Sequence, residues 1–182
     1  MVAANTCLDC KHGTEIAALV CAVDLVFAGQ LLLRMYKEGR QLALARPIAR
    51  MMVRAATPAL AARWPHAWVP LPASLARLKR NGFSPAQQLA REVAAQTAIP
   101  CRLDWLGQAY ESPPQKTLNR RERMRAVKGR FVADPAVAGL RIGLIDDVVT
   151  TASTVSAAAA AFRAAGANSV VVLAAARTPR RV

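Results

Sequence analysis

Two apolar runs near the end of the chain show the clearest pattern of hydrophobic positions. Residues 140–148 (LRIGLIDDV) and 169–177 (SVVVLAAAR) are apolar at most positions, apart from an acidic pair in the first run. Continuous apolar runs of this kind are typical of parallel strands that are buried on both faces. The residues between them, 153–167 (STVSAAAAAFRAAGA), are rich in alanine and predict a helix closed by Gly166. Strand, helix and strand in succession predict a βαβ unit.

Shorter patterns precede this unit. Residues 1–15 are polar and irregular, and residues 18–27 (ALVCAVDLVF) have the apolar, β-branched composition of a strand or of one arm of a hairpin. Helix formers fill residues 28–39 and end in a glycine. A helical period continues through residues 40–57, with Pro47 near its start.

The central third of the chain alternates in the same way. Residues 67–72 (AWVPLP) predict a buried strand that ends in a proline-rich turn, and a basic loop follows. Residues 84–98 predict a helix, because Ser84 is a suitable N-cap, a proline follows it, and a glutamine completes a capping box. Residues 99–109 are strand-like, and residues 113–131 form a basic segment. This alternation predicts an α/β protein with a doubly wound, mainly parallel sheet.

Composition limits the class of protein. The chain has 182 residues, of which 54% are hydrophobic and 20% charged, as expected for a globular protein of one domain with a short extension. Its net charge is +14, from 25 Lys and Arg against 11 Asp and Glu. So basic a balance indicates a polyanionic partner or substrate: a nucleic acid, a phosphate compound or an anionic membrane surface. The alternative is frequent arginine usage together with a solvated surface.

The cysteines and the apolar stretches indicate a compartment. Four cysteines in a chain of this length do not form the framework of a disulfide-rich protein. The sequence lacks the basic start of a signal peptide, and the apolar stretch at 16–33 is interrupted by Asp24 and Gln30, so no membrane span is expected. These features predict a protein of the reducing cytoplasm.

The acidic pair and the small residues after it indicate a binding site. In a doubly wound sheet, ligands bind at the carboxyl ends of the strands, which is where Asp146 and Asp147 would lie. The turn VVTTAST leads into a helix near Ser153, so backbone N–H groups would point outward at the positive end of the helix dipole. Such a turn binds phosphate, whereas carboxylates accept hydrogen bonds from sugar hydroxyls or bind hydrated Mg²⁺. A ribose 5-phosphate fits both halves.

Other phosphate-binding motifs are missing. The turn lacks the lysine of a Walker loop and the glycines of a dinucleotide-binding fold. The simpler alternative is a strand that merely ends in an aspartate-capped turn.

Four segments carry a resemblance to a known family. The segment IGLIDDVVTTAST resembles the phosphoribosyl-pyrophosphate signature of type I phosphoribosyltransferases. Three further segments resemble the ComF family of competence-associated, phosphoribosyltransferase-like proteins, and the similarity runs from about residue 17 to residue 177. These three are LLLRMYKEGRQLALARPIAR (31–50), VPLPASLARLKRNGFSPAQQLA (69–90) and QKTLNRRERMRAVKGRF (115–131).

The resemblance implies a division of the chain and a set of site residues. Residues 67–182 would form the phosphoribosyltransferase-like domain, and residues 1–66 an N-terminal extension with a zinc-module remnant, a hairpin and helices. Asp146 and Asp147 would hold the ribose hydroxyls, and the basic stretch 116–130 would close over the site. The 5-phosphate loop would consist of Thr150, Thr151, Ala152, Ser153 and Thr154. The pyrophosphate loop would lie around Pro72 and Ala73.

The sequence departs from the family pattern in two places. Ala152 stands where the phosphate loop usually has glycine, and alanine is strained by about 1 kcal/mol or more if that position needs a positive φ. Only Cys7 and Cys10 remain of a four-cysteine zinc module, which is half a site. The module is either degenerate or begins before the given sequence, so no protein zinc ligands are expected. Cys21 and Cys101 are expected to be small buried hydrophobes.

Basic side chains follow both loops of the predicted site. They would neutralise the leaving pyrophosphate, contact a nucleic-acid backbone, or form an ordinary solvated helix face. Those singled out are Arg77, Lys79, Arg80, Arg120, Arg121, Arg123 and Arg125.

Two functional hypotheses follow from the residues and the resemblance. The first is an enzyme that transfers ribose 5-phosphate from phosphoribosyl pyrophosphate, with Mg²⁺, to an acceptor that the sequence does not identify. The second is a non-catalytic protein of DNA uptake that binds single-stranded DNA and a helicase of the competence apparatus. The residues leave open whether the chain turns over a substrate.

Overall fold

The computed structural model of the protein describes residues 15–61, 63–109 and 130–179. In chain order, its helices and strands are β1 (Ala18–Asp24), α1 (Phe27–Lys37), η2 (Leu42–Leu44), α2 (Ala45–Leu60), β2 (Ala67–Pro70), α3 (Leu75–Asn81), α4 (Pro85–Thr97), β3 (Leu106–Gln108), β4 (Phe131–Ala133), η3 (Pro135–Val137), β5 (Arg141–Val149), α6 (Ser153–Ala164) and β6 (Ser169–Arg177).

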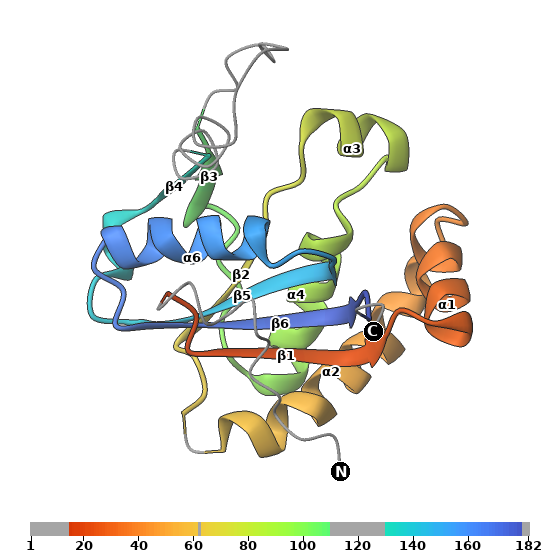
Figure 1. The fold of residues 1–182 in the computed structure, drawn as a ribbon, viewed down its shortest axis with the longest axis horizontal. Coiled ribbons are helices and arrows are strands. Elements are labelled where there is room, and N and C mark those ends of the chain that lie inside the picture. Colours follow the sequence, from red (N-terminus) through yellow and green to blue (C-terminus); the bar gives the residue numbers. More distant parts are fainter. Residues whose placement is uncertain (1–14, 62, 110–129, 180–182) are drawn as a thin grey trace.

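Four parallel strands form the central sheet, in the order β1-β6-β5-β2. The strands end on one side of the molecule, where α1 stands and α6 begins (Figure 1). The predicted βαβ unit is confirmed: β5 leads through α6 into β6, and Ile145 lies opposite Leu173 in the parallel ladder. The predicted α/β class with a mainly parallel sheet is also confirmed.

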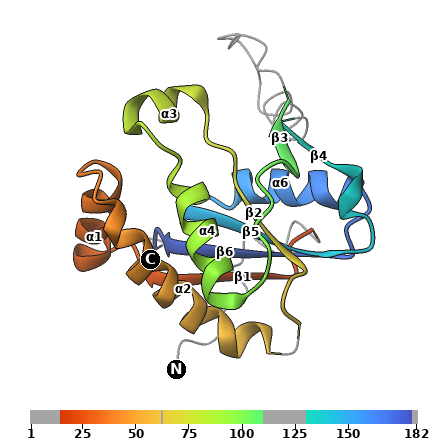
Figure 2. The ribbon, with the colours of Figure 1, turned by 180° about the vertical axis from the view of Figure 1, so that it is seen from behind.

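Helices cover both faces of this sheet, which makes it doubly wound. Alternate residues of β5 and β6 face opposite sides, as the pleat requires. Ile142 and Val172 pack in the core under α6, whereas Ile145 and Leu173 pack in the core formed with α1, α2 and α4. Figure 2 shows α4 and α2 in front of the sheet and α6 behind it. Both faces of each central strand are therefore dry, which explains its nearly continuous apolar sequence.

The segment before β2 belongs to the same sheet. β1 is an edge strand that pairs in parallel with β6, so of the two alternatives for residues 18–27 the strand is confirmed and the hairpin arm is wrong. A parallel partner must be reached by a long connection, and here the partner lies at the far end of the chain. The expected boundary at residue 66 falls between α2 and β2, and the sheet takes strands from both sides of it.

Two further expectations about local structure are corrected. The basic loop predicted after β2 contains the short helix α3, because residues 75–81 are mostly helix formers. The strand predicted at residues 99–109 is reduced to β3, which pairs antiparallel with β4 in a small separate sheet. Upstream of β3, Cys101 makes a single bridge to Trp68, because the chain only touches the edge of the main sheet there.

The predicted start of α4 is confirmed. The Ser84 hydroxyl accepts a hydrogen bond from the Gln87 backbone N–H at 3.4 Å, and Pro85 is the first helical residue. Cys21 and Cys101 pack against the two cores, but they are half-buried and not fully buried as expected. In the described part of the chain, no helix is long and apolar enough to cross a membrane.

Gly143 gives the first testable prediction. A Cβ added there would overlap the Trp68 ring and approach Pro65 Cγ to 2.8 Å, in a core with no room to relax. We expect Gly143→Ala to lower the free energy of unfolding by about 1–3 kcal/mol, measured by urea denaturation. Gly107→Ala is the control, since the nearest atom to its added Cβ is the Val132 carbonyl oxygen at 3.9 Å. Equal losses in the two variants would contradict the packing argument.

Candidate functional site

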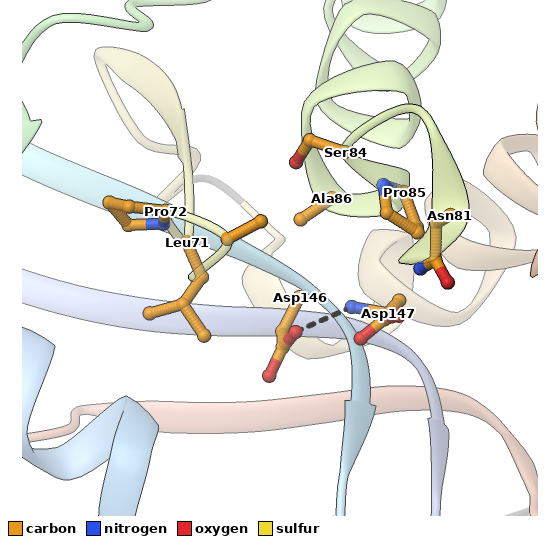
Figure 3. Close-up of a pocket in the computed structure, with 9 residues that line it drawn as sticks. Leu71, Pro72, Asn81, Ser84, Pro85, Ala86, Asp146 and Asp147 are labelled. Carbon is orange, nitrogen blue, oxygen red and sulfur yellow. Dashed lines mark hydrogen bonds between the residues drawn. The ribbon is translucent and has the colours of Figure 1, made fainter. Parts of the chain in front are cut away.

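Asp146 and Asp147 lie near the carboxyl end of β5 and are only 6% and 7% exposed. Backbone N–H groups hold both carboxylates: that of Asp147 donates to Asp146 Oδ1 at 2.8 Å, and that of Val148 donates to Asp147 Oδ1 at 2.7 Å. Figure 3 shows the first of these bonds and the two side chains beside one another. Two adjacent carboxylates are therefore fixed in place by their own strand.

Lys37, the last residue of α1, forms an ion pair with this acidic pair. Its Nζ lies 2.5 Å from Asp147 Oδ2, and the Lys37 and Asp147 side chains are 25% and 10% exposed. This ion pair joins the end of α1 to the carboxyl end of β5. A lysine so sheltered keeps its charge at low cost only if a counter-charge remains close.

The two carboxyl groups differ in proton affinity. Burial raises the pKa of Asp146 well above its usual range, and the neighbouring Asp147 charge raises it further. Burial acts on Asp147 in the same direction, but the Lys37 ammonium and hydrogen bonds outweigh it, so the pKa of Asp147 is lowered. The site thus combines an ionised Asp147 with an Asp146 that holds a proton more readily than an exposed aspartate.

Tyr36 lies next to Lys37 on the buried side of α1. Burial, followed by the Asp147 charge, raises the pKa of its hydroxyl, which donates a hydrogen bond to the Pro85 carbonyl oxygen at 3.0 Å. This bond ties α1 to the start of α4. The position of Lys37 is therefore fixed by packing as well as by charge.

The small residues after β5 form a turn at the start of α6. Thr150, Thr151 and Ser153 are exposed, and the Thr151 and Ser153 hydroxyls lie 2.9 Å apart. The first turn of α6 carries no acidic residue, and no side chain caps its N–H groups. Open N–H donors at the positive end of a helix dipole favour an anion.

Ala152 is not strained where the family pattern has glycine. It is the residue that precedes α6, with φ −61° and ψ 0°. This backbone conformation suits any L-residue, so the position does not need glycine for its φ and ψ in this structure.

Two cavities meet at the acidic pair. The larger, of about 690 Å³, lies between α1, the end of β5 and the turn before α6. The smaller, of about 20 Å³, lies between the turn after β2 and the start of α4, and it has room for about one water molecule. Figure 3 shows that Asn81, Ser84 and Pro72 surround it together with the acidic pair. The larger volume is in the range of small-molecule sites.

The structure brings many of the predicted site residues together. The larger cavity is lined by Asp146, Asp147, Thr150, Thr151, Thr154 and Arg80, and the smaller by the acidic pair with Pro72 and Ala73. Ala152 and Ser153 belong to the same turn, and Lys79 is exposed on α3. Arg77 is on α3, but its side chain is not described. The predictions for Cys7, Cys10, Arg120, Arg121, Arg123 and Arg125 lie outside the described residues.

Sequence reasoning missed one wall of the larger cavity. Gln30, Arg34 and Lys37 line it from α1, and Arg40 lines it just beyond that helix. Lys37 lies in a segment that resembles the family, but a single lysine in an amphipathic helix carries no signal for a role. Asn81, which is 9% exposed, was missed for the same reason.

Comparisons with known proteins support the fold. No family model matches the sequence, and no curated protein sequence matches it. The solved structure of an allosteric regulatory enzyme of purine biosynthesis is 20% identical, with a TM-score of 0.51 over 72% of this chain and 25% of that chain. Glutamine phosphoribosylpyrophosphate amidotransferase from B. subtilis, complexed with ADP and GMP, is 20% identical, with a TM-score of 0.52 over 72% and 26%.

The chain thus spans about a quarter of the length of each of these two proteins. At this identity the likeness concerns the fold alone. The predicted type I phosphoribosyltransferase fold is confirmed.

The unequal carboxyl groups give the second prediction. The pKa of Asp146 is higher in the folded protein than in the unfolded chain, where it is about 4. Its contribution to stability is therefore fully present below pH 4 and is lost as pH rises through the folded-state pKa. We expect Asp146→Asn to raise the free energy of unfolding at pH 7 relative to wild type, because Asn keeps the acceptor for the Asp147 N–H. This gain should shrink toward pH 4.

Asp147→Asn is the matched comparison. The lowered pKa of Asp147 contributes stability above about pH 4 that is lost as pH falls through its folded value. The variant should lose about 2 kcal/mol at pH 7, because Lys37 keeps a sheltered charge without its partner. Urea denaturation across this pH range measures both variants, and a parallel response of the two would contradict the assignment.

Proposed function

We propose that the chain binds phosphoribosyl pyrophosphate and transfers its ribose 5-phosphate to an acceptor. One observation carries the proposal: a buried acidic pair and an uncapped turn of small residues line the same cavity of about 690 Å³. The first suits the hydroxyls of a sugar, and the second suits a phosphate. The fold supports the proposal because open α/β sheets bind ligands at the carboxyl ends of their strands.

The turn at the start of α6 would bind the 5-phosphate. Its N–H groups are not capped by side chains, and the Thr151 and Ser153 hydroxyls add donors on the exposed side. Binding the phosphate there would fix the far end of the sugar and orient the anomeric carbon above the acidic pair.

Asp146 and Asp147 would act on the ribose. The ionised Asp147 accepts a hydrogen bond from a ring hydroxyl, and Asp146 accepts or donates according to its protonation. As the bond from the anomeric carbon to the pyrophosphate oxygen breaks, positive charge develops on the sugar ring. Negative charge held beneath the ring stabilises that state, and pyrophosphate leaves with the electron pair while the acceptor forms the new bond.

The leaving group would lie toward the turn after β2. Pro72 and Ala73 border the smaller cavity there, and Arg80 faces the larger one. Because the smaller cavity holds about one water molecule, a diphosphate requires this turn to open or extends into the larger cavity.

The side chains fit Mg²⁺ that arrives with its substrate. The described residues contain no cluster of three His, Cys, Asp or Glu side chains, so they offer no all-protein metal site. Mg²⁺ is commonly held by one or two carboxylates, substrate phosphates and water, and Asp146 and Asp147 would supply the carboxylates. When bound, the ion neutralises charge on the pyrophosphate.

Calorimetry tests the proposal. We expect phosphoribosyl pyrophosphate with Mg²⁺ to bind the wild type, and Asp146→Asn and Asp147→Asn each to weaken binding at least about tenfold, the value of one charged hydrogen bond. Ser153→Glu should weaken binding as strongly without lowering the melting temperature, because Glu suits the first turn of a helix but repels phosphate. The controls are Asp104→Asn and Asn168→Glu, which change charge at exposed positions away from the cavities. Absence of binding by the wild type would refute the proposal.

A second candidate function, binding of single-stranded DNA, is favoured by a row of arginines on α2. Arg46, Arg50 and Arg54 are all exposed at a spacing of four residues, about 6 Å along the helix axis, and α2 contains no acidic residue. Like charges at this spacing destabilise a helix, and a polyanion would relieve the repulsion. Action in the cytoplasm, in DNA uptake and with a competence helicase remains a prediction from the sequence.

A labelled oligonucleotide tests this candidate. Its affinity for the wild type should fall steeply between about 50 and 200 mM salt. Replacement of all three arginines by glutamine should reduce the slope of log K against log salt by about 2, since each lost contact to a single strand is worth about 0.7. An unchanged slope would exclude this face, and unchanged calorimetry with phosphoribosyl pyrophosphate is the control.

A further inference from the structure

We propose that α1 forms the acceptor side of the cavity and that Lys37 selects an acceptor carrying a carboxylate or a similar oxyanion. The inference rests on the proposed function, because it assumes that the ribose lies over Asp146 and Asp147. It adds the chemical class of the second substrate.

The sheet order places the acceptor. β2 lies on one side of β5, and β6 and β1 lie on the other. The turn after β2, at Pro72 and Ala73, borders the acidic pair on the leaving-group side. In an in-line displacement the nucleophile approaches the carbon from the side opposite the leaving group. The acceptor therefore enters from the side of β6 and β1, where α1 stands beside the strand ends (Figure 1) and where residues of α1 line the cavity.

Lys37 is the sheltered polar group of that wall. Leu25 and Leu33 make part of the wall apolar. The Gln30 amide already donates to the Leu25 carbonyl oxygen at 3.1 Å. The Arg34 side chain is 76% exposed and forms an ion pair with Glu38 at 2.9 Å, so a surface carboxylate already balances its charge. Lys37 is 25% exposed and reaches the acidic pair itself.

Charge balance then fixes the class of acceptor. Lys37 Nζ is 2.5 Å from Asp147 Oδ2, the atom that would also accept a ribose hydroxyl. This oxygen has lone pairs for both the hydroxyl and the ammonium, so the ammonium can keep its ion pair while the ribose is bound. The ammonium has three N–H donors and no acceptor, and those not used by Asp147 are available to an acceptor in the cavity. A carboxylate on the acceptor satisfies it, whereas an amino group in the same place repels it.

Two matched pairs of compounds test the inference. Nicotinate and nicotinamide differ only in carboxylate against carboxamide, and orotate and uracil differ by one carboxylate. Each is titrated by calorimetry into protein first saturated with ribose 5-phosphate. We expect the acid in at least one pair to bind tenfold or more tightly than its neutral partner. We also expect its affinity to rise when ribose 5-phosphate is present.

Substitutions at Lys37 assign the effect. Lys37→Met should abolish the preference for the acid, and Lys37→Arg should retain most of it because the charge remains. Arg91→Met, which removes an exposed positive charge outside the cavity, should leave the preference unchanged. Urea denaturation verifies that each variant is folded, and Lys37→Arg supplies the charge-retaining comparison if Lys37→Met does not fold.

The outcomes separate the inference from the function on which it rests. If ribose 5-phosphate itself does not bind, the proposed function fails. If ribose 5-phosphate binds but neither acid is preferred, the inference alone is wrong. A preference for the acid that persists in Lys37→Met also overturns it, because another group would then recognise the carboxylate.

Discussion

The burial of two adjacent carboxylates near the end of β5 is the constraint on which the site depends. Charges removed from water require local compensation, and this chain provides it in two ways. The strand itself donates backbone N–H groups to both side chains. A helix from the other end of the chain supplies Lys37 to one of them. The position of α1 over the strand ends is therefore coupled to the electrostatics of the acidic pair.

The two carboxyl groups are not compensated equally. Asp147 has the counter-charge, whereas Asp146 has a raised pKa and stays costly to ionise in the folded protein. A fold selected only for stability would replace such a residue by an apolar one, as at Ile145 one position earlier. Proteins place costly buried charges mainly at functional sites. In this chain the buried acidic pair lies at the edge of a large cavity.

The cavity is built from distant parts of the chain. The turn before α6 and the acidic pair come from the C-terminal third, and the opposite wall comes from α1 near the start. β1 anchors that wall because it pairs along its length with β6, the last strand of the chain. An N-terminal segment that adds an edge strand to the sheet thus also completes the site.

The sequence by itself determined the features that depend on neighbours in the chain. The apolar runs of β5 and β6, the alanine-rich α6 and the Ser84 cap follow from periodicity and capping within a few residues. The acidic pair could be placed at a strand end because strand and turn adjoin it directly. The sequence also indicated the ligand class of that turn, which remains a proposal.

Only the tertiary structure decided which distant elements meet. It gave β1 a parallel partner in β6, at the far end of the chain. It also brought Lys37 to Asp147, a contact that no local pattern encodes. The physical reason is that a residue's preference for helix or strand depends on neighbours within about one helical turn or two strand residues. Its charge partner is set instead by the order of strands in the sheet and by the helices that cover its two faces.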